Sequence, residues 1–334
     1  MSHDPADVWA MADLATPFAI RTVATLHVAD VLKDGPVPIK ELARRCGASP
    51  DPLARVLRFL VHRGLFTEPE PDTFGPNEVA RALESGAARD LRAWLDLDSA
   101  IGLSDLAFVE LLGQVRGKQI AYPAAYGRSL TEDLEHEPEL SDSFDDLMEN
   151  KSEEIVPEIV DTYDWDRFAH VADIGGGRGV LLAQLLRIHP SLRGTLADLP
   201  GPTAKAAEYL RAQGVSSRAE IVSRTLFDPL TVQADAFVLF DVLGDWEDDD
   251  AVRILARCAE AAGEDASVLI IEPSSDPDDQ RAFTEMDLRM MVYVGGRMRD
   301  APRTRQIVAD AGLFVAAVTQ LDNGYYIAEC LPDR

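Results

Sequence analysis

The second half of the chain alternates short apolar runs with segments of helical periodicity. The runs predict strands at residues 171–174, 195–198, 219–222, 235–240, 267–271, 313–318 and 324–329. Strands that alternate with helices build an α/β fold with a mainly parallel sheet, which binds ligands beyond the carboxyl ends of its strands. We therefore expect a ligand-binding α/β domain at residues 165–334.

The first third of the chain predicts helices followed by two short strands. Apolar residues recur at helical spacing over residues 7–33, with a break at Pro17, and again over residues 37–47. Ser49 and Pro50 have the residue types of a helix N-cap and first helical position. After the helix that they begin, the sequence predicts strands at residues 65–67 and 73–75. Two helices followed by a two-stranded wing form a winged-helix arrangement.

A mostly helical segment joins these two parts. Residues 122–127 predict a turn-rich break within it, and residues 148–163 predict a helix that leads into the first strand of the sheet. The sequence thus predicts a winged-helix domain at 1–105, a helical linker and acceptor-pocket region at 106–164, and the α/β domain at 165–334.

The charge of the chain excludes several classes of partner. Its 58 acidic and 32 basic side chains among 334 residues give a net charge of −26. This charge argues against nucleic acid and against an anionic membrane as partners. Arginines on the helix that follows Ser49 could face DNA in a winged-helix protein, but in so acidic a chain we expect them to form a solvated face.

Other sequence features predict a cytoplasmic protein. The chain has no apolar run of about 18 residues, the length needed to span a bilayer, and its first residues lack the basic and apolar regions of a signal peptide. Cys46, Cys258 and Cys330 are scattered without the spacing of metal ligands. We expect them to be reduced thiols, and we expect no metal site.

A glycine turn follows the first predicted strand of the α/β domain. Gly175 and Gly177 lie in it, and Asp173 precedes it. Glycine allows a sharp turn and the close approach of a ligand, and a carboxylate at this place suits an ammonium group better than a phosphate. Asp198, at the end of the next predicted strand, can accept hydrogen bonds from ribose hydroxyls. S-adenosylmethionine has such an ammonium group and no phosphate. Together these residues favour nucleoside binding over a strand–helix turn without a ligand.

Seven segments occur in the order found in one enzyme family, at residues 14–17, 92–97, 126–127, 163–165, 173–177, 245–248 and 286–290. From about residue 11 to residue 330, the chain resembles the small-molecule S-adenosylmethionine-dependent O-methyltransferases with an N-terminal winged-helix dimerisation domain. This family includes plant caffeate enzymes and bacterial aromatic-polyketide enzymes. Within it, the chain is most similar to bacterial naphthoate O-methyltransferases of antibiotic pathways.

The resemblance implies a Rossmann-like methyltransferase sheet and a set of residues that bind S-adenosylmethionine. That set is Asp173, Gly175, Gly177, Asp198, Leu199, Thr225, Leu226 and Phe240. Two positions depart from the family pattern, because Arg224 replaces a glycine and Phe240 replaces a polar residue. We expect the backbone contacts to the cofactor to survive these changes.

The catalytic position departs further. Many relatives carry a histidine that takes the proton of the acceptor hydroxyl, and this chain has Gly244 in its place. Asp245 and Asp287 are the expected catalytic residues, because an acidic phenol needs only a weak proton acceptor once the reactants are held together. The missing histidine also leaves open a homologue that runs another reaction on a similar substrate, such as hydroxylation, decarboxylation or cyclisation.

The resemblance further implies a small aromatic substrate, an aromatic polyketide of the hydroxynaphthoate type, and a homodimer. Aromatic and methionine side chains suit a planar acceptor, and Arg297 could bind its carboxylate. The expected acceptor residues are Trp94, Phe108, Tyr126, Met148, Trp246, Met286, Met290 and Arg297.

Overall fold

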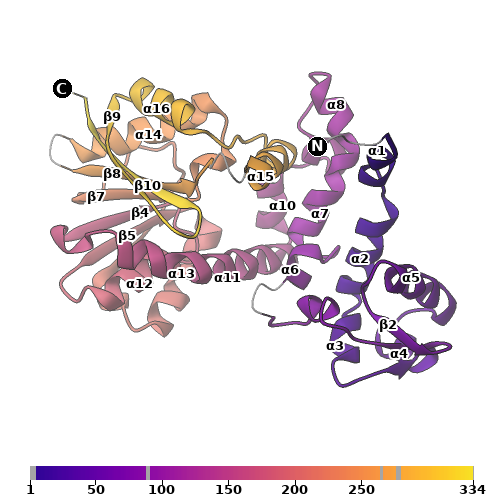
Figure 1. The fold of residues 1–334 in the computed structure, drawn as a ribbon. Helices are drawn as coiled ribbons and strands as arrows, with labels where there is room; N and C mark the ends of the chain where they lie inside the picture. The colour runs from indigo at the N-terminus through magenta and orange to yellow at the C-terminus, as the bar shows by residue number, and fades with distance from the viewer. Residues whose placement is uncertain (1–4, 88–90, 264–265, 276–279, 334) are drawn as a thin grey trace. The chain divides into compact units, whose positions relative to one another are not determined.

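The computed structural model describes residues 5–87, 91–263, 266–275 and 280–333, and the chain divides into two compact units between Leu106 and Ala107 (Figure 1). Unit 1 ends one residue beyond the first predicted domain. In unit 2 the helices of the predicted linker continue into the sheet domain, so the predicted division at residue 164 stays a prediction.

Unit 1 is a small helical domain with a three-stranded sheet. Its elements are α1 (Pro5–Met11), α2 (Ala15–Thr25), α3 (Val28–Leu32), β1 (Val37–Pro38), α4 (Ile39–Arg45), α5 (Pro50–His62), β2 (Thr67–Glu70), β3 (Thr73–Gly75), the 3-10 helix η1 (Ala80–Leu83), α6 (Leu91–Leu95) and α7 (Ala100–Leu106). The strand order is β1-β3-β2, with antiparallel pairing throughout. Two helices followed by a hairpin match the predicted order.

The predicted helix break in unit 1 is wrong in position. The chain turns at residues 12–14, and Pro17 lies in the first turn of α2. A proline is tolerated there because the backbone nitrogen of a first-turn residue has no intrahelical partner to lose. The core of the unit is apolar and forms around Leu32, Leu42, Leu57, Leu60 and Phe74.

Unit 2 begins with a run of helices. They are η2 (Ala107–Glu110), α8 (Leu111–Val115), α9 (Ala121–Tyr126), α10 (Leu130–His136) and α11 (Pro138–Thr162). The turn predicted at residues 122–127 is therefore wrong: this segment is the short helix α9, which Gly127 ends with a φ of +83°. Likewise, α11 starts ten residues before the helix predicted from residue 148, and it contains Pro157 without ending there.

The rest of unit 2 is an α/β sheet with helices between its strands. The elements are η3 (Trp165–Arg167), β4 (His170–Ile174), α12 (Val180–Ile188), β5 (Arg193–Asp198), α13 (Pro200–Ala212), η4 (Ser216–Arg218), β6 (Ala219–Ser223), β7 (Ala236–Phe240), η5 (Leu243–Asp245), α14 (Asp248–Ala262), β8 (Ser267–Pro273), α15 (Gln280–Tyr293), α16 (Ala301–Asp310), β9 (Leu313–Gln320) and β10 (Tyr325–Pro332). All seven predicted strands are present, and the mainly parallel α/β fold is confirmed.

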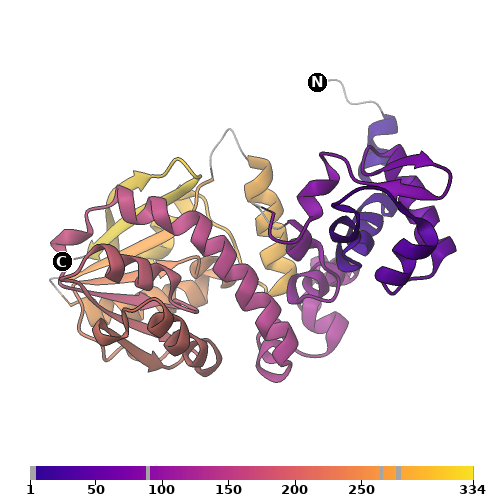
Figure 2. The ribbon, with the colours of Figure 1, turned by 90° about the horizontal axis from the view of Figure 1, so that it is seen from below.

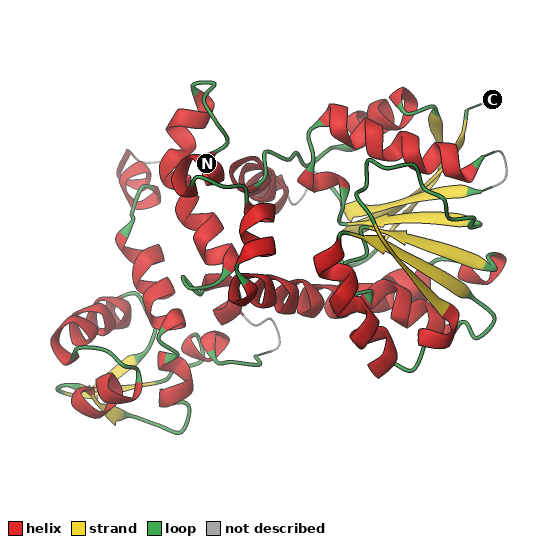
Figure 3. Cartoon of the chain, turned by 180° about the vertical axis from the view of Figure 1, so that it is seen from behind, coloured by secondary structure: helices red, strands yellow, loops and turns green. Residues whose placement is uncertain are grey.

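The sheet has the strand order β6-β5-β4-β7-β8-β10-β9, and only β10 pairs antiparallel with its neighbours (Figure 3). One face packs on α11, α12 and α13, and the other packs on α14 and α16 (Figure 1). The chain runs outward from β4 to β6 and then returns to β7 on the other side of β4. This reversal opens a crevice at the carboxyl ends of β4 and β7, where such sheets bind ligands.

Among the helices of the described residues, none is both long and apolar enough to cross a membrane.

Candidate functional site

The glycine turn after β4 has the backbone geometry that its sequence predicted. Gly175 and Gly177 have φ values of +73° and +56°, which favour glycine. The N–H of Gly175 donates to the carbonyl oxygen of Ala197 at 2.8 Å, and this bond holds the turn against β5. A Cβ built on Gly177 meets no atom within 4 Å, so the turn faces open space on its ligand side.

Asp173 lies beneath this turn with a carboxylate oxygen that is not satisfied. The residue is only 1% exposed, and its Oδ2 has no hydrogen-bond partner among the described residues. Burial, and then the charge of Asp198, raise the pKa of Asp173 to about 7, while a backbone hydrogen bond from Leu182 lowers it in part. A Cβ on Gly176 would stand 2.5 Å from Oδ2, so only glycine fits above this carboxyl group.

Asp198 ends β5 beside the same turn. Its Oδ2 accepts a hydrogen bond from the N–H of Gly177 at 2.7 Å, and its Oδ1 accepts one from the N–H of Leu199 at 2.6 Å. Burial raises the pKa of Asp198, and these two backbone bonds oppose the shift. The carboxylate is only half-buried, so it joins the glycine turn to the start of α13 and keeps an accessible side.

The remaining predicted cofactor residues lie at the ends of β6 and β7. Thr225 is exposed, whereas Leu226 is half-buried against the core. The guanidinium of Arg224 bonds the carbonyl oxygen of Pro229 and the hydroxyl of Thr231 within its own loop. Phe240 packs near Tyr325, with ring centroids 6.1 Å apart. The large cation at position 224 is thus bound by its own loop.

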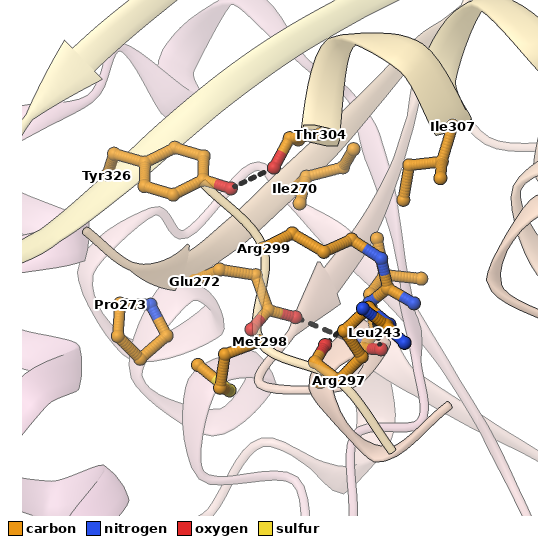
Figure 4. A pocket seen from close by; sticks show the side chains of 11 residues that line it. Leu243, Ile270, Glu272, Pro273, Arg297, Met298, Arg299, Thr304, Ile307 and Tyr326 are labelled. Atoms are coloured by element: carbon orange, nitrogen blue, oxygen red, sulfur yellow. Dashed lines mark hydrogen bonds between the residues drawn. The ribbon is translucent and has the colours of Figure 1, made fainter. Parts of the chain in front are cut away.

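Two buried side chains, those of Glu272 and Arg299, hold the loop around Gly244 (Figure 4). The N–H of Leu243 donates to Glu272 Oε1 at 2.8 Å. On the other side, Arg299 donates to the carbonyl oxygens of Leu243 at 2.7 Å and of Trp246 at 2.6 Å. Arg299 also pairs with Asp248 at 2.8 Å. These bonds fix the backbone of the loop at the place where the family resemblance predicts a catalytic base.

Met298 and Glu272 stand beside Gly244 in the lining of a small pocket (Figure 4). A Cβ built on Gly244 would meet Met298 Sδ at 3.0 Å and Glu272 Oε2 at 3.6 Å. On the neighbouring segment, a Cβ on Gly296 would lie 2.3 Å from the carbonyl oxygen of Gly244, so the two backbones are in direct contact. The thioether of Met298 therefore occupies room that a side chain at position 244 would need.

Of the two predicted catalytic carboxylates, Asp245 has the properties of a proton acceptor. Surrounding protein, and then the charge of Asp241, raise the pKa of Asp245 to about 7, although Lys151 lowers it and the side chain keeps access to solvent. Asp287 uses Oδ1 to accept a hydrogen bond from the N–H of Met298 at 2.9 Å. The structure thus gives Asp287 a contact that holds Met298 over Gly244, and the catalytic roles stay predictions.

The sequence analysis missed a polar cluster next to this loop. Asp241 has a positive φ of +53°, and its Oδ2 lies 2.9 Å from Lys151 Nζ and 3.1 Å from the hydroxyl oxygen of Tyr325. Burial opposes the charge of Lys151, but the carboxylate of Asp241 gives a net rise in its pKa. Glu272, whose pKa is raised by burial, completes the cluster. An acid directly after the fourth predicted strand was the available signal for Asp241.

Most of the predicted acceptor residues come together within unit 2. Helix α15, which carries Met286 and Met290, packs against η2 with Phe108, against α9 with Tyr126, and against η5, next to Trp246. Gln114 fastens this arrangement, since its side chain donates to the carbonyl oxygen of Met291 at 2.8 Å.

The other predicted acceptor residues have separate surroundings. Met148 lies half-buried on α11, and Trp94 lies half-buried on α6 in unit 1. Arg297 is exposed and pairs with Glu247 at 3.2 Å, so an acceptor carboxylate would compete with that pair. Its predicted role stays a prediction.

The residues at the crevice fit S-adenosylmethionine. The unsatisfied oxygen of Asp173 suits an ammonium group, the glycine turn leaves room for close approach, and the carboxylate of Asp198 suits a ribose. The carboxylates of Asp173, Asp198 and Asp245 influence one another electrostatically and favour a cation at this edge.

Cofactor binding is expected to release a proton from Asp173. With a pKa of about 7, the carboxyl group of the free protein is mostly protonated at pH 6, and a bound ammonium group favours its ionised form. Calorimetric titrations at pH 6 in two buffers of different ionisation enthalpy should reveal this release, which should shrink at pH 7.5. Asp173→Asn should remove the proton release. Asp245→Asn shows how much of the release comes from the carboxyl group of Asp245, whose pKa is also about 7. Binding heats that are independent of buffer at pH 6 would contradict the expectation.

Models of two protein families match the chain. An O-methyltransferase domain matches residues 108–314, and an O-methyltransferase dimerisation domain matches residues 9–85. The two matches lie in unit 2 and unit 1 respectively.

Individual relatives cover almost the whole chain. The 2,7-dihydroxy-5-methyl-1-naphthoate 7-O-methyltransferase of Streptomyces carzinostaticus is 46% identical over 92% of this chain and 92% of its own length. The aclacinomycin 10-hydroxylase RdmB of Streptomyces purpurascens is 36% identical over 92% of this chain and 83% of its own length. The O-methyltransferase NcsB1 of neocarzinostatin biosynthesis, solved with S-adenosylmethionine and 2-hydroxy-5-methyl naphthoic acid, is 43% identical. Its structure superposes with a TM-score of 0.93 over 99% of this chain and 100% of that one.

Proposed function

This chain belongs to the O-methyltransferase family and is an O-methyltransferase that uses S-adenosylmethionine; on that premise, we propose that it methylates a phenolic hydroxyl of an aromatic polyketide of the hydroxynaphthoate type in antibiotic biosynthesis. The observation that carries the choice of acceptor is the 46% identical relative, whose name specifies a dihydroxynaphthoate.

The side chains around α15 support a planar, apolar acceptor. Met286 and Met290 lie one turn apart on this helix. The elements packed against it carry Phe108 and Tyr126, and Trp246 follows η5 with its ring against Phe227 at 4.9 Å. Aromatic and thioether groups make favourable contacts with the faces and edges of a fused ring. Arg297 at the adjoining loop is the proposed partner of a carboxylate on that ring.

The proposed chemistry relies on position more than on a strong base. When bound, S-adenosylmethionine supplies an electrophilic methyl group. The rigid loop at residues 243–246 fixes the site, and Asp245, with a pKa of about 7, accepts the proton of the acceptor hydroxyl. A proton acceptor works best with a pKa near the operating pH, and holding the reactants in place is worth roughly 7–11 kcal/mol of the barrier. An acidic naphthol suits this arrangement better than an alcohol.

We also propose that unit 1 is a winged-helix dimerisation module and that the enzyme is a cytoplasmic homodimer. Support comes from large apolar side chains left exposed on and between α1 and α2, namely Val8, Trp9, Met11, Leu14 and Phe18. Such a patch on one chain marks an interaction site. The free state of the three cysteines agrees with a reducing compartment.

The proposed dimer can be tested at Trp9, which is 85% exposed. Trp9→Glu places a charge in the apolar patch and is expected to convert a dimer into a monomer in sedimentation velocity. Val79→Glu, at a residue that is 60% exposed in the same unit outside α1 and α2, is the matched control and should leave the dimer intact. Sedimentation of the unmodified chain as a monomer would overturn the proposal.

The acceptor is tested with cofactor labelled in its methyl group. Incubation with a panel of hydroxynaphthoates should give a labelled aryl ether, and the matching benzylic alcohols should give none. A product that is altered but unlabelled would favour the alternative, a hydroxylation, decarboxylation or cyclisation of a similar substrate. Gly244 and the 36% identical hydroxylase are the observations that favour this alternative. Labelled cofactor that stays unconsumed with every phenol would reject this acceptor class.

A further inference from the structure

The N-terminal part of α11 has few buried side chains. Of its residues 138–154, only Leu147 is buried, whereas Ile155, Val156, Ile159 and Val160 bury its last turns in the core. Pro157 lies between these parts and lacks the N–H that would bond back along the helix. Apolar packing therefore anchors the C-terminal end of α11 and provides little hold on the preceding turns.

Ion pairs hold those turns instead, and their partners lie on different segments that follow strands of the sheet. Lys205 Nζ, on α13 after β5, lies 2.8 Å from Asp142 Oδ1 and 2.5 Å from Asp145 Oδ2. Arg178, in the glycine turn after β4, is 2.8 Å from Asp146 and 2.5 Å from Glu149. The four acids have the spacing of one helix face.

In a third pair the cation lies on α11 and the carboxylate lies on the loop of the sheet. Lys151 on α11 lies 2.9 Å from Asp241, which follows β7. The loops after β4, β5 and β7 lie at the carboxyl ends of adjacent parallel strands and carry the predicted cofactor residues. Residues 138–154 of α11 thus run along the ligand-binding edge of the sheet (Figure 2).

We propose that residues 138–154 of α11 form a strap over the cofactor crevice, that ion pairs hold this strap closed, and that Lys205 and Arg178 are positioning residues that set how long the cofactor stays bound. The strap can move as a unit because few apolar contacts oppose it and Pro157 weakens the helix at its base. Opening breaks the pairs of Lys205, Arg178 and Lys151, and closing holds the glycine turn and α13 in place.

These pairs differ from ordinary surface pairs in two respects. The side chains of Asp145 and Arg178 are 15% and 18% exposed, whereas those of Asp142 and Asp146 are 65% and 68% exposed. Water therefore screens the pairs of Lys205 with Asp145 and of Arg178 with Glu149 less than it screens a fully exposed pair. Each cation also serves two carboxylates, and Lys205 has a third partner in the hydroxyl of Ser141 at 3.0 Å. Loss of one cation therefore removes several contacts that connect two elements.

The test uses tritiated S-adenosylhomocysteine, whose dissociation is followed after a chase with unlabelled compound. This probe carries no net charge, so a strong effect of salt reports on the protein. Dissociation from the unmodified enzyme is expected to accelerate several-fold between 50 and 500 mM NaCl, because salt screens the ion pairs that hold the strap closed. In Lys205→Gln it is expected to be about three- to tenfold faster at low salt and to depend less on salt, because the pairs of Arg178 and Lys151 remain.

Controls separate a strap from a general loss of stability. Lys205→Arg should keep the slow dissociation, and the exchange of charges in Lys205→Asp with Asp145→Lys should recover part of it. Arg44→Gln removes an exposed pair with Glu41 on α4 in unit 1 and should change nothing. The proposal is overturned if Lys205→Gln dissociates at the unmodified rate with an unchanged salt dependence, or if Arg44→Gln has the same effect.

Discussion

Arg299→Met is expected to lower the free energy of unfolding by about 3–5 kcal/mol and methyl transfer by roughly 100-fold. The guanidinium is 7% exposed and donates to the carbonyl oxygens of Leu243, Trp246 and Arg297 while it pairs with Asp248. Methionine fills a similar volume but leaves these buried acceptors without donors. The loop that carries Asp245 then loses its fixed position, and displacement of a site by about 1 Å can cost 100-fold in rate.

Arg303→Met is the matched control for this experiment. Arg303 pairs with the same Asp248 but is 52% exposed, so its loss should change stability by less than about 1 kcal/mol. Denaturant unfolding and turnover of a hydroxynaphthoate should be measured on both variants. Equal effects of the two substitutions would show that the ion pair with Asp248 matters and that the bonds to the loop carbonyls do not.

Gly244→His is expected to fail to restore a working base. The backbone of Gly244 does not require glycine, since its φ is not positive, but an imidazole there must displace Met298 Sδ, which stands 3.0 Å from the new Cβ. Overpacking of this kind costs about 1–3 kcal/mol. Turnover is therefore expected to stay at or below that of the unmodified enzyme, with a lower midpoint of thermal unfolding.

The double variant Gly244→His with Met298→Ala should behave differently. Removal of the thioether makes room for the imidazole, and Glu272 Oε2, 3.6 Å from the Cβ position, is close enough to orient it. A general base contributes about 10²- to 10⁴-fold, so turnover of weakly acidic phenols should rise by roughly 100-fold, with a smaller gain for acidic naphthols. A rise of the same size in Gly244→His alone would show that Met298 does not block the position.

The sequence predicted the fold well because its signals are local. Seven apolar runs predicted seven strands of a mainly parallel sheet. A short apolar run between two helical segments is typical of a buried strand, because it is too short for a buried helix. Two local predictions were wrong for the same kind of reason. Pro17 fits inside the first turn of α2, and residues around Pro123 form the helix α9, because a proline at the start of a helix loses no hydrogen bond.

Part of the candidate site could also be predicted from sequence. Asp173 and Asp198 end consecutive predicted strands, and parallel strands bring their carboxyl ends to one edge of the sheet. The positions of Glu272, Arg299 and Lys151 could not be predicted in this way. They contact residues that are 29, 56 and 90 positions distant in the chain, and no local pattern specifies such partners.

The sequence by itself predicted the family, the sheet and, through the family resemblance, position 244 as the place where a catalytic base is expected and glycine stands. Only the tertiary structure decided what surrounds that position. Met298 stands beside Gly244, and the buried side chains of Glu272 and Arg299 hold the loop from two sides. The physical reason is that a buried polar group must find partners, and the folded chain supplies them from strands and loops far apart in sequence.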